Sequence, residues 1–172
     1  MSMIYEGKVA WVFPDHFDID MIIGMENTRE HDISKLIPIA MSMYEEDFAA
    51  KVSKGDFLVA GRNFGYGHAH RQCMETIRQI GINTVIAESF APGFFRAEAG
   101  NGMALLSVPG ITGKASRGDS LKIDFPAGLV ENKTTGETIQ GDRPGEVILD
   151  LVRLGGNSGF LKEKLAEEKP AE

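Results

Sequence analysis

Residues 56–108 alternate between short apolar runs and amphipathic segments, and this alternation restricts the possible fold more than any other feature of the sequence. Three strands and two helices are predicted here, in the order Asp56–Ala60, Arg71–Ile80, Asn83–Ala87, Phe90–Ala99 and Met103–Val108. A strand–helix–strand–helix–strand order favours parallel strands that are joined by crossover helices. The chain is therefore expected to be an α/β protein.

The flanking segments add shorter elements around this central pattern. Before it, the sequence predicts a strand at Lys8–Phe13, a loop of functional length at Glu26–Lys35 and a helix at Tyr44–Val52. After it, the predicted elements are strands at Ser120–Phe125, Gly128–Glu131 and Thr135–Gln140 and a helix at Pro144–Leu154. Crossover helices thus give way to short strands joined by turns in the last third of the chain.

Length and composition limit the kind of protein this can be. One domain is expected over residues 1–172, with a core in 1–160 and a charged, fraying tail in 161–172. The net charge of −7 and the lack of a basic tract argue against a general nucleic-acid binder. No signal peptide and no membrane-spanning run are apparent, so a cytoplasmic protein is expected.

The cysteine content excludes a further class of site. Cys73 is the single cysteine of the chain, so the chain forms no internal disulfide and by itself supplies no cysteine set for zinc or an iron–sulfur cluster. Its position beside the apolar face of the predicted helix at Arg71–Ile80 suggests a small core residue.

A glycine-rich segment precedes that helix. It reads Gly-Arg-Asn-Phe-Gly-Tyr-Gly over Gly61–Gly67. The donor side chains in and just after it are Arg62, Asn63, His68, His70 and Arg71. Glycines let the backbone approach a ligand closely, and the N–H groups at a helix N-terminus favour negative charge. The segment is a candidate site for a carboxylate or a phosphate.

Other interpretations of this loop stay open. It can be only a tight turn before a helix. The spacing of Gly61, Gly65 and Gly67 does not match the dinucleotide fingerprint, and no lysine stands where a phosphate loop needs one. His68 and His70 would face the same side of an extended segment, but no third metal ligand is apparent, so no metal site is predicted.

Several motifs in register resemble the swivel domain of the aconitase and isopropylmalate isomerase family. The loop resembles the family form Gly-x-Asn-Phe-Gly-Cys-Gly-Ser-Ser-Arg-Glu. Asp18-Ile19-Asp20, which precedes Met21-Ile22-Ile23, resembles Asp-Thr-Asp-x-Ile-Ile, and residues 85–91 resemble Val-Ile-Ala-x-Ser-Phe-Ala. A looser match covers Phe94-Phe95-Arg96 and Asn101-Gly102. The resemblance extends over about residues 5–160, in the same order and with little gapping.

The resemblance implies a swivelling β/β/α domain with a mixed, barrel-like sheet flanked by helices. It implies the small subunit of a two-subunit hydro-lyase, similar to 3-isopropylmalate dehydratase of leucine biosynthesis, that works only with a larger subunit. It also implies that this partner, and not the present chain, carries a 4Fe-4S cluster. The expected substrate is a malate-type hydroxy di- or tricarboxylic acid.

The sequence departs from the family where the chemistry is expected. His68 and Ala69 stand where the family has its two serines, the first of which acts as a base, and His70 and Arg71 replace the arginine and glutamate. In one interpretation His68 or His70 abstracts the proton, since an imidazole titrates near neutral pH, and Arg71 holds a carboxylate. In the other, the chain is a divergent relative with another substrate, or a non-catalytic, regulatory swivel domain that binds an anion.

A second candidate region is the loop at Met25–Asp32. Arg29 falls on an arginine of the family's Tyr-Leu-Arg segment, while Asn27 and Thr28 replace the tyrosine and leucine. This resemblance implies a carboxylate contact for Arg29 and a more polar pocket for the substrate's side group. With Arg71, the predicted substrate-binding set includes Asn63, Gly65 and Gly67, which shape the loop. Arg29 can equally be a solvated loop charge.

Overall fold

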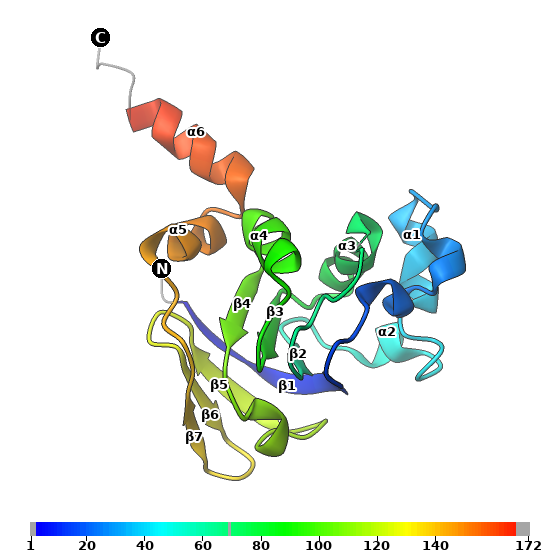
Figure 1. The fold of residues 1–172 in the computed structure, drawn as a ribbon, viewed down its shortest axis with the longest axis horizontal. Coiled ribbons are helices and arrows are strands. Elements are labelled where there is room, and N and C mark those ends of the chain that lie inside the picture. The colour runs from blue at the N-terminus through cyan, green and yellow to red at the C-terminus, as the bar shows by residue number, and fades with distance from the viewer. Residues whose placement is uncertain (1–2, 69, 168–172) are drawn as a thin grey trace.

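The computed structural model describes residues 3–68 and 70–167. Within them, the strands form a single curled sheet in the order β4-β3-β2-β1-β5-β6-β7 (Figure 1). The strands are β1 Ile4–Phe13, β2 Phe57–Ala60, β3 Thr84–Ala87, β4 Ala104–Ser107, β5 Ser120–Asp124, β6 Leu129–Asn132 and β7 Thr138–Gln140. β1 to β4 are mutually parallel, whereas β5, β6 and β7 join β1 through antiparallel pairs.

Strand β1 belongs to both halves of the sheet. Residues from Ile4 to Lys8 pair with β5, and residues from Val9 to Phe13 pair with β2 across a shift in register. The strand is longer than the predicted Lys8–Phe13, because its first residues alternate between exposed and half-buried positions and lack an apolar run. Gly7 permits the close approach there, since an added Cβ would lie 2.2 Å from the carbonyl oxygen of Gly55.

The crossover helices confirm the predicted β/α alternation. α3 Arg71–Gln79 and α4 Pro92–Gly100 connect β2 to β3 and β3 to β4. In β2, Leu58 and Ala60 face one buried cluster, which includes α3 and α4, and Phe57 and Val59 face a second cluster shared with β5, β6 and β7. Because both faces of β2 are covered, its sequence is a continuous apolar run.

Three predicted helices begin before the observed ones, and the one predicted at Pro144–Leu154 begins at Glu146. The helix predicted at Tyr44–Val52 is only α2, Phe48–Lys51, because Asp47 takes a left-handed conformation with φ of 59° directly before it. The helix predicted from Phe90 begins at Pro92, since Phe90 forms a β-bridge with Phe64.

The remaining segments contain short helices. The predicted loop at Glu26–Lys35 holds the 3-10 helix Met25–Asn27 and the start of α1, Ile33–Leu36, and a further 3-10 turn covers Ile19–Ile22. The C-terminal helices are α5 Glu146–Arg153 and α6 Asn157–Glu167. α6 projects from the body (Figure 1).

α6 makes residues 161–167 helical, whereas a fraying tail was expected over 161–172, and the rest of that tail lies outside the described residues. No helix in the described ranges is long and apolar enough to cross a bilayer.

Candidate functional site

Three loops meet at the carboxyl ends of the parallel strands. The loop after β1 contains Asp18 and Asp20, the glycine-rich loop after β2 leads into α3, and the loop after β3 contains Ser89. β-bridges join Asp18 to Tyr66 and Phe64 to Phe90, so the three loops form one surface. In open α/β sheets this edge is the usual place for a ligand.

The glycine-rich loop is held from beneath by aromatic packing. The Phe64 side chain is fully buried, with its ring centroid 5.3 Å from those of Phe13 and Phe94. Gly65 has φ of +84° and lies so close to Phe94 that an added Cβ would come within 2.2 Å of that ring. Only glycine fits this conformation and this contact without strain. The loop is therefore a rigid support for the residues that follow it.

Asn63 and Gly67, both predicted to bind substrate, make internal contacts at this edge. The Asn63 backbone N–H donates to Ser89 Oγ at 2.9 Å, and its side-chain amide lies 3.1 Å from His16 Nδ1. An added Cβ on Gly67 would lie 2.9 Å from the Asp18 carboxylate. The observed contacts thus give these residues a role in the shape of the loop.

His70 is tied to a buried carboxylate. Its ring Nδ1 lies 2.7 Å from Asp20 Oδ2, and its backbone N–H donates to Asp20 Oδ1 at 3.0 Å. The Asp20 side chain is 6% exposed, whereas the His70 side chain is 41% exposed. One edge of the imidazole is therefore fixed to the protein while the ring remains accessible.

The Asp20 carboxylate is kept ionised by its donors. Burial opposes its charge, but the hydrogen bonds from the His70 backbone and ring and from the Cys73 thiol outweigh burial and lower the pKa of Asp20. The thiol donates to Asp20 Oδ1 at a distance of 3.3 Å. Burial, reinforced by this nearby carboxylate, raises the pKa of Cys73, so the residue is a neutral thiol at physiological pH. Cys73 is fully buried, as predicted for a core residue.

His68 lies next to His70 without a comparable anchor. The two ring centroids are 5.6 Å apart and their planes are almost perpendicular. His68 is exposed. Ala69, which lies between them where the family has its second serine, is outside the described residues. The structure brings both predicted proton-transfer residues together, and His70 is the one that contacts the buried Asp20 carboxylate.

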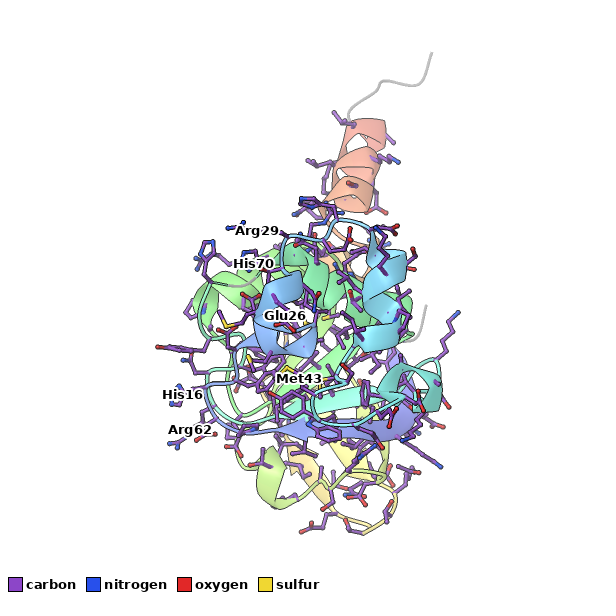
Figure 2. All side chains as sticks on the ribbon, turned by 90° about the vertical axis from the view of Figure 1, so that its right-hand side faces the viewer. His16, Glu26, Arg29, Met43, Arg62 and His70 are labelled. Carbon is purple, nitrogen blue, oxygen red and sulfur yellow. The ribbon has the colours of Figure 1, made fainter. Side chains whose placement is uncertain are left out.

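The arginines predicted to hold carboxylates lie on neighbouring elements. Arg71 is the exposed first residue of α3. Gln72 Nε2 donates to the Thr28 carbonyl oxygen at 3.1 Å and lies 3.3 Å from His31 Nδ1, which fixes the 25–32 loop against α3. Figure 2 shows the exposed Arg29 and the half-exposed His70 on the face turned to the viewer.

A cavity of about 400 Å³ adjoins this contact between the loop and α3. It is lined by His31, Ile33, Arg71, Gln72 and Glu75. Arg71 and Glu75 put opposite charges on its wall, while most of its lining surface is apolar, so an aliphatic group also fits there.

Arg62, another donor of the loop, is committed elsewhere. Its guanidinium donates to Asp15 Oδ2 through Nε at 2.8 Å and Nη2 at 2.6 Å, and its backbone N–H donates to Asp15 Oδ1 at 2.7 Å. These contacts lower the pKa of Asp15. Arg62 and His16 lie at one edge of the face shown in Figure 2, away from His70. Arg62 therefore joins the first two loops.

The side chains present do not fit an iron–sulfur cluster. Cys73, the single cysteine, is a buried thiol hydrogen-bonded to Asp20. Within residues 3–68 and 70–167 no group of three or more histidine, cysteine or acidic side chains is arranged to hold a metal ion. A cluster needs a set of cysteine thiolates that this chain cannot supply.

The sequence did not predict the pairing of Asp20 with His70 and Cys73. In the sequence, Asp20 was identified only as part of a family motif, and Cys73 only as a core residue. A separation of 50 residues between Asp20 and His70 leaves no periodic signal, so a single sequence could show only that both motifs flank predicted strands. The Gln72–His31 contact was missed for the same reason.

Comparisons with known proteins agree with this geometry. Residues 19–111 match the family model of the aconitase C-terminal domain. The chain belongs to this family. It is 34% identical to the isopropylmalate/citramalate isomerase small subunit of Methanocaldococcus jannaschii, over 98% of this chain and 100% of that protein. It is 36% identical to the 3-isopropylmalate dehydratase small subunit of Pyrobaculum calidifontis, over 94% of this chain and 99% of that protein.

A solved structure extends the similarity to three dimensions. The crystal structure of 3-isopropylmalate dehydratase (leuD) from M. jannaschii superposes with a TM-score of 0.85 and 30% identity, covering 96% of this chain and 98% of that chain. The predicted fold and the predicted aconitase family are confirmed. The comparisons also support the predicted lyase subunit over a separate anion-binding module.

Proposed function

We propose that this chain is the small subunit of a heteromeric dehydratase or isomerase that acts on a malate-type hydroxy di- or tricarboxylic acid, with His70 as its proton-transfer residue. The observation that supports it most is the half-exposed His70 ring on a buried, ionised Asp20, at the edge where the family's base is expected. The names of the relatives place the reaction in leucine biosynthesis or a similar pathway, and a cytoplasmic location fits that role.

The chemistry asked of His70 is removal of a carbon-bound proton. The neutral imidazole takes the proton next to a substrate carboxylate, and the C–H electron pair forms the double bond as the hydroxyl on the adjacent carbon leaves with the C–O pair. Solvent protonates the hydroxide to water, and His70 then releases its proton to solvent. A positioned imidazole contributes roughly 10²–10⁴-fold to such a step.

Arg71 and Arg29 are the proposed carboxylate ligands. Both side chains are exposed, and the Gln72–Thr28 hydrogen bond holds the loop of Arg29 beside the residue that follows Arg71. A guanidinium binds a carboxylate through two parallel hydrogen bonds, which orients the substrate as well as holding it. Asn27 and Thr28, which stand where the resembled family has tyrosine and leucine, favour a substrate whose side group is more polar than isopropyl.

A larger partner subunit completes the proposed enzyme. The relatives are named as small subunits, and this chain lacks the cysteines for a cluster. We therefore assign any 4Fe-4S cluster to the partner. No step attributed to the residues of this chain depends on it.

The test is purification of the tagged chain from its native host, followed by identification of the co-purifying protein, an iron assay and a screen of hydroxy acids. Recovery of a larger iron–sulfur protein and dehydration of a malate-type acid are expected. In the reconstituted complex, H70N should lower kcat by about 100-fold or more, and H68N should lower it far less. A chain that purifies alone, or an H70N complex with full turnover, would contradict the proposal.

A further inference from the structure

We propose that Asp20 is a positioning residue that fixes the His70 ring with its proton on Nδ1 and presents Nε2 as the reactive atom, with the Cys73 thiol as a further donor to the same carboxylate. This inference rests on the proposed role of His70 in proton transfer. It assigns a tautomer to His70 and a supporting role to Asp20 and Cys73. The base of the resembled family is a serine, so this arrangement is not carried over from it.

The tautomer follows from the count of donors and acceptors around Asp20. Oδ1 accepts the His70 backbone N–H at 3.0 Å and the Cys73 S–H at 3.3 Å. Oδ2 lies 2.7 Å from His70 Nδ1. An ionised carboxylate only accepts hydrogen bonds, so the close contact at Oδ2 requires a proton on Nδ1. In the neutral ring this leaves the lone pair on Nε2.

The surroundings keep Asp20 in the ionised form that this count needs. Its Oδ1 has two donors and Oδ2 one, and these contacts hold its pKa below the ordinary value despite burial. The Asp20 backbone N–H donates to Asp18 Oδ1 at 3.0 Å, which fixes the turn that carries it. The titratable groups beside the Asp20–His70 pair are Asp18, His68 and Cys73, and Arg71 follows His70 in the chain.

This arrangement suits a base in two ways. The ring cannot rotate about its side-chain bonds without losing the 2.7 Å contact, so Nε2 keeps one direction. The Asp20 charge also stabilises the imidazolium that forms when Nε2 takes a proton. Because the His70 backbone N–H donates to the same carboxylate, Asp20 also fixes the position at which α3 begins.

The first test is a nuclear magnetic resonance measurement on the full chain without a partner subunit. The nitrogen-15 chemical shifts of the four histidine rings of the full chain report which nitrogen carries the proton. H70N identifies the signals of His70 by their loss. At a pH where the ring is neutral, we expect an Nδ1–H tautomer for His70. A neutral ring protonated on Nε2 would overturn the inference.

The second test uses variants in the reconstituted enzyme. An asparagine at position 20 offers an N–H₂ group to Nδ1, so D20N should move the proton to Nε2 and lower kcat by roughly 10²–10⁴-fold, with KM changed less than about threefold. The rate–pH profile of D20N should differ in shape from that of wild type, because the carboxylate that contacts the His70 ring is replaced by an uncharged amide. C73S keeps a donor to Oδ1 and should retain kcat within about threefold, whereas C73A should lower kcat more than C73S does.

The outcomes separate this inference from the proposed function. If H70N retains full turnover, the assignment of His70 as the base fails. If H70N loses activity and a folded D20N keeps the wild-type kcat and pH profile, the positioning role of Asp20 fails. Circular dichroism and the melting temperature establish folding, and a D20E variant that restores part of the lost rate would support a carboxylate requirement.

Discussion

At the scale of single residues, the glycine-rich loop separates side chains that shape it from side chains that reach solvent. Phe64 and Gly65 are fully buried, whereas His68 and Arg71 are exposed within a few positions of them. Substitutions at exposed positions change stability little unless they disturb a specific contact. The chemistry of this loop can therefore be altered with little effect on the fold, which suits two histidines in positions where the resembled family has other residues.

Loss of either proposed carboxylate ligand should weaken substrate binding. A hydrogen bond to a charged group contributes about 1.5–3 kcal/mol, so R71A and R29A should each raise KM by roughly 10-fold or more in the complex, with unchanged melting temperatures. R96A is the matched control, because Arg96 is an exposed arginine on α4. Steady-state kinetics give KM. Equal KM values for R71A and R96A would remove Arg71 from the substrate site.

The Asp20 cluster should make stability depend on pH in the acid range. The pKa of Asp20 is lower in the folded chain than its unfolded value of about 3.9, so the folded state favours the charged form. The resulting stabilisation is fully present above that unfolded value and is lost as pH falls through the folded one.

Urea unfolding of wild type and D20N at pH 7, 5 and 3 measures this effect. Wild type should exceed D20N in unfolding free energy at pH 7 and 5, and the difference should shrink at pH 3. A difference that is constant over this range would show that the charge of Asp20 does not stabilise the fold.

At the scale of elements, the connection from β2 to α3 depends on glycine. G65A adds a methyl group in contact with Phe94 and puts a side chain at φ of +84°. We expect a loss of about 1–3 kcal/mol or more in unfolding free energy, measured by denaturant titration. G93A is the control, since Gly93 lies in α4 with open space around its Cα and should change stability by under about 1 kcal/mol. Equal stability of both variants would refute the constraint.

The elements that the sequence predicted well are those with a strong local pattern. β2, α3, β3 and β4 have continuous apolar runs or a clear helical period, and each lies within a few residues of its predicted range. The helix predicted at Tyr44–Val52 was too long because Asp47 takes a left-handed conformation, as Met41 does shortly before it. Aspartate tolerates this conformation, but its presence in a helical run does not by itself predict a break. Such turns are determined by tertiary contacts, for example the Met41 N–H bond to the Ile22 carbonyl oxygen.

The candidate site was predictable to the same extent. A glycine-rich loop before a helix identified the place, and the residue types identified His68, His70, Arg71 and Arg29 as candidates. What the sequence could not show is which histidine has a partner, because the Asp20–His70 contact joins loops that follow different strands. Contacts of that kind depend on the register of the parallel sheet, and hydrophobic patterning does not encode them locally.

At the scale of the whole molecule, both halves of the sheet should unfold together. β1 is paired with β2 and with β5, and the two buried clusters lie on opposite faces of the same strands. The chain's single tryptophan, Trp11, lies on β1, where the Arg117 guanidinium sits 4.6 Å from its ring centroid and Phe48 packs against its edge. Its fluorescence therefore reports contacts with the segments that precede β2 and β5.

Tryptophan fluorescence and far-ultraviolet circular dichroism should accordingly give the same urea midpoint, which is the test of two-state unfolding. Hydrogen exchange of the β3 and β6 amides should yield similar free energies of opening. Separate midpoints, or β6 amides that exchange through a much less stable state, would show that the antiparallel half unfolds independently.

The double pairing of β1 also affects the order in which the nascent chain can fold. β1 is synthesised before the other strands, but the partner of Ile4 is Asp124 on β5, which is synthesised much later. At about 5–20 residues per second, the first residues of β1 therefore wait roughly 6 to 24 s for their partner strand. Throughout that interval the strand presents unpaired backbone groups to the translation machinery and its chaperones. Ribosomes stalled before residue 120 would thus display an N-terminus open to proteolysis, even when the parallel half has already formed.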